Sequence, residues 1–314
     1  MRDEFLWVEK YRPKTIDECV LPDRLKKIFQ EFVDNKQIPN LLLYGSSGVG
    51  KTTVARALCE EVDCDSIVIN GSEESGIEVL RNKITQFATT GSLMYAGSRK
   101  MVILDEADYL NIQSTQPALR NAMEDFSRNC GFILTCNYPA KIMPALHSRC
   151  SVIDFSIKES EKENIKISFI ERVKDILAAE SIPYQDSVLE QLSDQFMPDL
   201  RRILNELQKS AAGGVIDADS LVNYETVSIN DLCQLLRKKK FEDVRSWVVE
   251  NQDNEPTVIL RQIYDSLSDM LKPDSVPGAV VIIADYSYKT AFVSDQEINL
   301  VSCLVELMAN CEFK

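Results

Sequence analysis

Gly45-Ser46-Ser47-Gly48-Val49-Gly50-Lys51-Thr52 is the stretch of this sequence that decides its fold. It has the pattern GxxxxGK[ST], it follows the apolar run 40–44, and it opens a predicted helix over 51–62. Glycines let backbone N–H groups curve round phosphates, and the positive end of the helix dipole faces them. Lys51 has the reach for the β- and γ-phosphates of ATP, and the Thr52 hydroxyl is a ligand for Mg²⁺. The pattern predicts a P-loop; the alternative is a chance glycine-rich turn.

A second apolar run ends in two carboxylates. The residues Met101–Leu104 lead directly into Asp105 and Glu106. At a strand end beside the phosphates, Asp105 can hold Mg²⁺ through water, and Glu106 can take a proton from the attacking water molecule. A general base here indicates hydrolysis rather than transfer to a second substrate. Without the P-loop, the two residues would be ordinary surface acids.

The first half of the chain alternates apolar runs with helical segments. The runs predict buried parallel strands over 40–44, 66–70, 101–106, 131–137 and 151–155. Helices are predicted between them over 51–62, 76–89 and 115–127. Strands that alternate with crossover helices form a doubly wound α/β domain.

The second half is helical. Apolar residues recur at helical spacing over 158–180, 185–196 and 198–211, and Gly213-Gly214 predicts a helix stop and hinge. Further helices are predicted over 229–240, 241–251, 256–271, 276–292 and 295–311. The last is apolar on more than one face, which indicates burial in a bundle or a subunit interface. We therefore expect domains over 1–156, 157–212 and 213–314.

The composition is that of a soluble globular protein, with 45% apolar and 27% charged residues among 314. No run reaches the roughly 18 uncharged apolar residues of a membrane helix, and the chain opens without a signal-peptide pattern. We expect a cytoplasmic protein that does not bind membranes. The nine cysteines form no CxxC pair, and His147 is the one histidine, so neither a disulfide scaffold nor a zinc site is expected.

The charge is distributed unevenly. Of a net charge of −14, residues 1–155 contribute 18 Lys and Arg against 21 Asp and Glu, and residues 156–314 contribute 17 against 28. Such an acidic protein does not coat nucleic acid with its whole surface. Contacts to phosphate backbones are therefore expected from a local patch in the first half.

Several motifs carry a family resemblance. Asp105-Glu-Ala-Asp108 has the letters of the DEAD-box helicases, but those need a second α/β half, which the sequence does not predict. The chain instead resembles the AAA+ subunits of sliding-clamp loaders, namely the small subunits of replication factor C and the large clamp-loader subunit of tailed phages. Besides the P-loop, the matching motifs are Trp7-Val-Glu-Lys-Tyr-Arg-Pro13, Asn70-Gly-Ser72, Gly76-Ile77, Gln116-Pro-Ala-Leu-Arg120-Asn-Ala-Met-Glu124, Thr135-Cys-Asn137 and Ser148-Arg149-Cys150.

The resemblance covers residues 7–210 closely, whereas the last hundred fit only in length and helical character. It implies a P-loop AAA+ ATPase domain with a parallel sheet, followed by a helical lid and a C-terminal all-α collar domain. Ser46-Ser47 stand where replication factor C usually has two prolines, which should loosen the loop but spare its phosphate contacts.

The resemblance also assigns roles outside the P-loop. Asn137 would orient the attacking water or sense the γ-phosphate, and Arg201, on a lid helix, would contact the phosphates while Arg202 faces elsewhere. Arg149 would enter the neighbouring subunit's ATP site as an arginine finger. Plainer alternatives are a strand-end turn for Asn137, a helix-surface arginine for Arg201 and a surface ion pair for Arg149.

An adenine pocket is implied by the opening motif. By resemblance, its residues are Val8, Glu9, Lys10, Tyr11 and Val20. Tyrosine and valine side chains offer flat apolar contact, although they could equally be plain core packing. The nucleotide contacts would be completed by the P-loop residues Gly45, Gly48, Val49, Gly50, Lys51 and Thr52, and by Thr53 directly after it.

A DNA-binding patch is expected near the start of the helix at Gly76. The candidates are Gly76, Arg81 and Lys83, together with Arg120 on a later helix. Clamp loaders often carry a basic residue just before the Gly-Ile pair, where it can couple DNA to the catalytic glutamate. Here that position is Ser75, so the coupling either passes to Arg81, Lys83 or another group, or is weaker.

A short apolar cluster between Gly91 and Gly97 is the candidate clamp contact. Leu93, Met94 and Tyr95 have no periodicity that would bury them in their own domain. They either fold back onto the sheet or stand exposed as a hydrophobic contact for a partner. In the family, this connection faces the sliding clamp.

The expected function is that of an ATP-driven clamp-loader subunit that opens a sliding clamp and places it on primer–template DNA. The resemblance implies a five-membered ring of several copies of this chain plus one different small subunit. A phage-encoded protein would act in the host cytoplasm. The alternatives are another AAA+ machine on DNA, such as a helicase loader or initiator, and a clamp-loader arm without hydrolysis of its own.

Overall fold

The computed structural model describes residues 5–74, 76–90, 99–216, 229–251, 256–290 and 292–314. The chain divides into two compact units, Met1–Leu221 and Val222–Lys314, which we describe separately. The sequence-based division into 1–156, 157–212 and 213–314 sets a further boundary inside the first unit, and that boundary remains a prediction.

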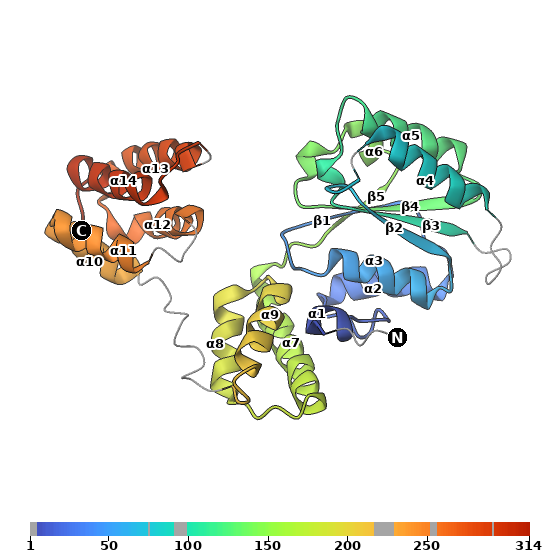
Figure 1. The fold of residues 1–314 in the computed structure, drawn as a ribbon, viewed down its shortest axis with the longest axis horizontal. Coiled ribbons are helices and arrows are strands. Elements are labelled where there is room, and N and C mark those ends of the chain that lie inside the picture. The colour runs from blue at the N-terminus through green and yellow to red at the C-terminus, as the bar shows by residue number, and fades with distance from the viewer. Residues whose placement is uncertain (1–4, 75, 91–98, 217–228, 252–255, 291) are drawn as a thin grey trace. The chain divides into compact units, whose positions relative to one another are not determined.

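A five-stranded parallel sheet forms the centre of the first unit (Figure 1). Its strands are β1 (Leu41–Tyr44), β2 (Ser66–Asn70), β3 (Lys100–Asp105), β4 (Cys130–Cys136) and β5 (Ser151–Asp154), in the order β2-β3-β4-β1-β5. Leu41 of β1 pairs with Ile133 of β4 on one side and Ser151 of β5 on the other. The predicted α/β class with a parallel sheet is confirmed. In such a sheet, ligands bind at the carboxyl ends of the strands.

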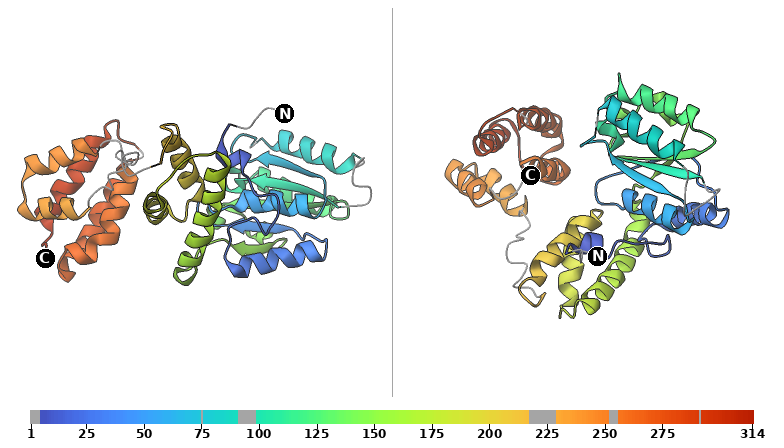
Figure 2. Two further views of the ribbon diagram at one scale, coloured as in Figure 1. Left: turned by 90° about the horizontal axis from the view of Figure 1, so that it is seen from below. Right: turned by 45° about the vertical axis from the view of Figure 1, so that its right-hand side comes forward.

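Helices cover both faces of this sheet (Figures 1 and 2). The covering elements are α2 (Asp23–Asp34), α3 (Lys51–Glu61), α4 (Ile77–Thr89), α5 (Thr115–Asp125) and α6 (Pro144–His147), with the short η1 (Ala107–Tyr109) and η2 (Pro139–Lys141). Successive residues of β1 point to opposite faces: Leu41 and Leu43 pack with α2 and α3, whereas Leu42 packs with α4, α5 and α6. The central strands β1, β3 and β4 are mostly apolar because both of their faces are buried, whereas the edge strands β2 and β5 are partly exposed.

Three helices and the start of the chain share a second core in this unit. They are α7 (Glu159–Ala179), α8 (Asp186–Phe196), α9 (Leu200–Ala211) and α1 (Trp7–Lys10). Trp7 is 5% exposed and packs among the apolar residues of α7–α9, and its backbone N–H donates to Gln208 Oε1 at 3.0 Å. Trp7 of α1 is therefore part of the core of α7–α9, the helical group that we call the lid.

The second unit is a helical bundle. Its elements are α10 (Ile229–Lys238), α11 (Phe241–Glu250), α12 (Pro256–Met270), η4 (Pro273–Ser275), α13 (Val276–Thr290) and α14 (Gln296–Asn310). Its core includes Trp247, which is 7% exposed, and Leu304, Leu307 and Cys303 from the apolar helix α14. Among the helices that the structure describes, none is long and apolar enough to cross a membrane.

Candidate active site

The P-loop joins β1 to α3 through glycines in left-handed conformations. Gly48 and Gly50 have φ angles of 74° and 90°, which residues with a Cβ atom rarely adopt. At Gly45, a Cβ atom would lie 3.0 Å from Cβ of Phe155. Val49 is buried in the core below the loop. The loop thus turns at the carboxyl end of β1 and presents the N-terminus of α3, where backbone N–H groups attract anions.

Lys51, the first residue of α3, has its ammonium group buried among oxygen atoms. Its Nζ donates hydrogen bonds to the carbonyl oxygens of Gly45 at 2.8 Å and Ser46 at 2.7 Å, and to Asn137 Oδ1 at 2.8 Å. Burial lowers the pKa of the Lys51 side chain, which is 8% exposed. Its direct hydrogen-bond acceptors are all neutral, so an incoming phosphate is a favourable partner for the positive charge.

Asp105 ends β3 and accepts hydrogen bonds from two hydroxyl groups. Thr52 Oγ1 and Thr135 Oγ1 both donate to Asp105 Oδ1, at 2.6 Å and 2.5 Å. A carboxylate and a hydroxyl side by side are oxygen ligands of the kind that Mg²⁺ prefers. These residues therefore fit a magnesium ion beside the P-loop.

Glu106 follows in a well-defined backbone turn. Its φ and ψ angles of 55° and 45° are left-handed, and its N–H donates to Thr135 Oγ1 at 3.1 Å. Gly71, next to β2, supports the turn because its N–H donates to the Asp105 carbonyl oxygen at 2.7 Å. A Cβ atom on Gly71 would lie 2.6 Å from the Glu106 carbonyl oxygen. Such unusual backbone is typical of functional sites.

Asp108 holds the backbone that carries Asn137, a role that the sequence analysis did not assign. Its Oδ2 accepts from the N–H groups of Asn137 at 3.2 Å and Tyr138 at 3.1 Å. The side chain is 7% exposed, and its Oδ1 is buried without a hydrogen-bond partner in the described part of the chain. The sequence did contain a sign of this role, because Asp108 is the last residue of the motif Asp105-Glu-Ala-Asp108.

A cavity beside the P-loop is lined from both the sheet and the lid. Its polar side is formed by residues that include Gly48, Gly50, Lys51, Thr52, Thr53, Asp105, Glu106, Asn137 and Arg201. Its more apolar side includes Val8, Tyr11, Val20, Phe169, Ile176 and Leu204. A polar end next to an apolar end suits a ligand with a charged group and a flat ring system.

The opening motif contributes to this cavity only in part. Val8, Tyr11 and Val20 line it, whereas Glu9 and Lys10 are not among the described residues that do. Glu9 forms an ion pair with Arg12, and Lys10 Nζ lies 2.6 Å from Glu180 Oε1 after the end of α7.

Arg12 lines the cavity as well and donates to Thr53 Oγ1 at 3.3 Å. The sequence analysis quoted this arginine in the opening motif but assigned it no role. Arg12 therefore brings a cationic group of the opening motif to this cavity, whereas Lys10 is not among the described residues that line it.

The start of α9 meets the P-loop. Arg201 lines the cavity, whereas the guanidinium of Arg202 lies over the ring of Phe196, 4.3 Å from its centroid. Asp199 caps the helix by accepting from the Arg202 N–H at 3.0 Å. A Cβ atom on Gly48 would lie 1.7 Å from Asp199 Oδ1, so only glycine allows the loop and the lid this close.

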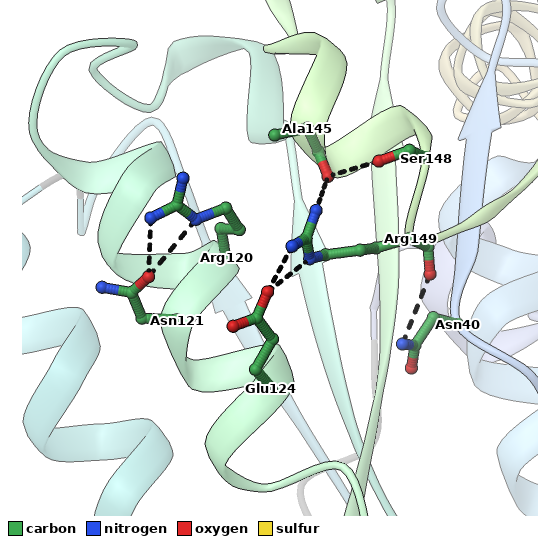
Figure 3. A network of polar contacts seen from close by, with 7 residues as sticks. All are labelled: Asn40, Arg120, Asn121, Glu124, Ala145, Ser148 and Arg149. Carbon is green, nitrogen blue, oxygen red and sulfur yellow. Dashed lines mark hydrogen bonds and ion pairs between the residues drawn. The ribbon is translucent and has the colours of Figure 1, made fainter.

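Arg149 lies elsewhere, between β5 and the C-terminal part of α5 (Figure 3). It is not among the described residues that line the cavity. Its side chain forms an ion pair with Glu124, and its Nη1 donates to the Ala145 carbonyl oxygen at 2.8 Å. Arg149 is therefore separate from the cavity of its own chain.

The candidate DNA residues belong to α4 and α5. Gly76 is the N-cap of α4 in an extended conformation, and Arg81 is exposed on that helix. Lys83 forms an ion pair with Glu74, and Arg120 is half-buried on α5. The predictions for Ser75 and for Leu93, Met94 and Tyr95 fall outside the described residues.

Comparison with known proteins decides the family. Residues 41–158 match the ATPase family associated with various cellular activities (AAA). The chain is 30% identical to the sliding-clamp-loader large subunit of Enterobacteria phage T4 over 317 residues, which is 99% of this chain and 98% of that protein. This chain belongs to the sliding-clamp-loader family of AAA ATPases. It is also 34% identical to the replication factor C small subunit of Staphylothermus marinus, over 97% of this chain and 94% of that one.

A solved structure supports the fold of this clamp-loader ATPase. A RuvB mutant from Thermotoga maritima superposes with a TM-score of 0.53 at 17% identity, over 72% of this chain and 78% of the other. At this identity the likeness concerns the fold alone. The comparisons confirm the predicted family, the AAA+ fold with nucleotide binding, the ATPase class and the clamp-loader function in DNA replication.

Proposed function

We propose that this clamp-loader ATPase hydrolyses ATP with Mg²⁺ inside a ring of subunits, and thereby opens a sliding clamp and places it on primer–template DNA. The observation that carries the proposal is the cavity where Lys51, Asp105, Glu106, Asn137 and Arg201 meet. A cation for the phosphates, a metal-binding carboxylate, a general base and two polar groups for the γ-phosphate come together there.

ATP would enter with its phosphates at the P-loop and its adenine between Val8, Tyr11 and Val20. Lys51 would exchange its carbonyl partners for phosphate oxygens, a stronger interaction because both groups are charged. Thr52 and Asp105 would hold Mg²⁺, which supplies positive charge beside the β- and γ-phosphates when bound.

Hydrolysis would use Glu106 as the general base. The backbone turn at Asp105-Glu106 presents this carboxylate to the cavity, where it can take a proton from a water molecule facing the γ-phosphate. Asn137 already faces Lys51 and would contact the same water molecule or phosphate. Arg201 would stabilise the negative charge that develops on the phosphoryl oxygens.

Arg149 would complete the neighbouring subunit's site. It lies outside the cavity of its own subunit and forms an ion pair with Glu124 at a half-exposed position, where a stronger anion could replace that carboxylate. A finger supplied in trans requires head-to-tail contacts, which close into a ring or spiral.

The second unit would act as the collar that holds the ring together. Four large apolar side chains of α13, α14 and the connection between them are more than half exposed: Val281, Tyr288, Phe292 and Ile298. The rings of Tyr288 and Phe292 contact each other at a tilt of 51°, with centroids 5.0 Å apart. Exposed apolar groups of this kind are typical of interfaces. We expect five subunits, several of them copies of this chain and one a different small subunit.

DNA would contact the α4 and α5 side of the ATPase domain through Gly76, Arg81, Lys83 and Arg120. Backbone contacts from a spiral of subunits would recognise duplex shape rather than sequence. The clamp would bind Leu93, Met94 and Tyr95.

The test is ATP hydrolysis by the assembled loader, with and without clamp and primed DNA. Glu106→Gln should retain ATP binding and lose turnover by about 10² or more, whereas Lys51→Ala should lose both. Parental turnover in Glu106→Gln would contradict the assignment of the base. ATPase activity that ignores both clamp and primed DNA would contradict clamp loading and favour a different AAA+ machine.

A further inference from the structure

All three nitrogen atoms of the Arg149 guanidinium are engaged within its own subunit (Figure 3). Nε donates to Glu124 Oε1 at 3.0 Å, and Nη2 donates to the same oxygen. Nη1 donates to the carbonyl oxygen of Ala145 at 2.8 Å. The hydrogen bonds from Arg149 lower the pKa of Glu124, so its carboxylate is charged at neutral pH. In this conformation, the finger is occupied by an anion of its own subunit.

The backbone of Arg149 is fixed, so exchange of partners is a side-chain motion. Its N–H donates to the Leu146 carbonyl oxygen at 3.1 Å, and its own carbonyl oxygen accepts from Asn40 Nδ2 at 3.5 Å. The side chains of Arg149 and Glu124 are 34% and 56% exposed. Because solvent screens such a pair, water or another anion can easily replace Glu124 as the partner of Arg149.

We propose that Glu124 is a latch that holds the arginine finger on its own subunit until the nucleotide of a neighbour competes for it. The inference rests on the proposed action of Arg149 in trans. ATP phosphate carries more negative charge than one carboxylate and binds a guanidinium fork at least as well. When the neighbouring ATP site is too far away, Arg149 remains paired with Glu124. When the subunit interface closes, Arg149 pairs with a phosphate of the neighbour's ATP instead. Glu124 is thus a positioning residue that sets the fraction of engaged interfaces.

The test compares two acidic residues of the same helix in the assembled loader. Glu124→Gln removes the charge that pairs with Arg149, and Asp125→Asn makes the same charge change next to it on an exposed residue. ATPase activity is measured with ATP and Mg²⁺ present, first without clamp and DNA and then with saturating clamp and primed DNA. Glu124→Gln should raise the unstimulated rate roughly two- to fivefold, the range expected of an exposed ion pair, and leave the stimulated rate unchanged. Asp125→Asn should leave both rates unchanged.

An unstimulated rate in Glu124→Gln that equals the parental rate, or a lower stimulated rate, overturns the latch. Arg149→Ala separates this failure from a failure of the proposed function. If Arg149→Ala loses turnover and Glu124→Gln changes nothing, the finger acts in trans but the latch is wrong. If Arg149→Ala turns over ATP at the parental rate, both are wrong. In the double variant Glu124→Gln/Arg149→Ala, the gain from Glu124→Gln should vanish; a gain that persists also overturns the latch.

Discussion

Gly48→Ala tests whether the P-loop and the lid are in contact as closely as the structure has them. The new methyl group would lie 1.7 Å from Oδ1 and 3.0 Å from Cα of Asp199, the residue that caps α9. The Asp199 side chain must then rotate away and release the Arg202 N–H, which it accepts at 3.0 Å. Gly50→Ala is the matched control, since φ there is also positive but no atom lies within 4 Å of the added Cβ.

The loss in the free energy of unfolding caused by Gly48→Ala has two contributions. An alanine with left-handed φ costs about 1–2 kcal/mol, and this term applies to Gly48→Ala and Gly50→Ala alike. Loss of the Asp199 cap costs about 1 kcal/mol and applies to Gly48→Ala alone. We therefore expect the free energy of unfolding of the first unit to fall by about 1 kcal/mol more in Gly48→Ala than in Gly50→Ala. For a unit of this size, that difference is a midpoint lower by roughly 2–4 °C.

The assay is thermal and denaturant unfolding of the nucleotide-free protein, which keeps the loss of phosphate contacts out of the comparison. Asp199→Ala serves as the second arm, because it removes the oxygen that the methyl group meets. The costs of Gly48→Ala and Asp199→Ala should sum to more than the cost of the double variant by about 1 kcal/mol. Equal costs at Gly48 and Gly50, or simple additivity with Asp199→Ala, would refute the contact.

Three further predictions concern the cavity and its supports. Arg201→Ala should weaken ATP binding roughly tenfold, because a charged hydrogen bond is lost. Arg202→Ala should leave the dissociation constant for ATP unchanged, because the Arg202 guanidinium lies on Phe196. Titration with a fluorescent ATP analogue measures both constants. Gln116→Leu should lower the free energy of unfolding by about 2–4 kcal/mol, measured in urea, because the buried amide bonds three backbone groups at 2.8–3.0 Å; a near-neutral result would contradict this network. Burial raises the pKa of Cys136 to about 12, so its thiolate fraction at pH 9 should be about a thousandth. Alkylation of this thiol should therefore be slower than in the unfolded chain by a factor of roughly 10² or more, as measured by mass spectrometry.

Local sequence was sufficient for most of the fold. The five strands were predictable because each contains a short apolar run, although only the central β1, β3 and β4 are buried on both faces, and the structure moves the predicted ends by at most one residue. Helix α2 (Asp23–Asp34) was not predicted, although Leu25 and Phe29, four residues apart, form its buried stripe. Its charged outer face and the lack of a side-chain cap at Pro22 leave a weaker signal than an apolar strand does.

The residues of the candidate site likewise fall into those that local sequence predicts and those that it does not. Lys51, Thr52, Asp105 and Glu106 could be predicted because contiguous residues make the loop and the strand end. The contact of Asp199 with the P-loop could not, because it depends on how the lid packs, some 150 residues further along the chain. The same holds for Glu124 and Arg149, which are 25 residues apart and meet only across the packed ends of α5 and α6.

The chain contains two tryptophans, and each lies in a different compact unit. Trp7 is packed in the lid core behind the nucleotide cavity, and Trp247 is packed in the helical bundle of the second unit. Buried indole rings fluoresce at shorter wavelength than rings in water. The variant Trp247→Phe would therefore leave one native fluorophore that follows the lid, and Trp7→Phe one that follows the second unit. Nucleotide binding, assembly and unfolding can thus be followed unit by unit in the unlabelled protein.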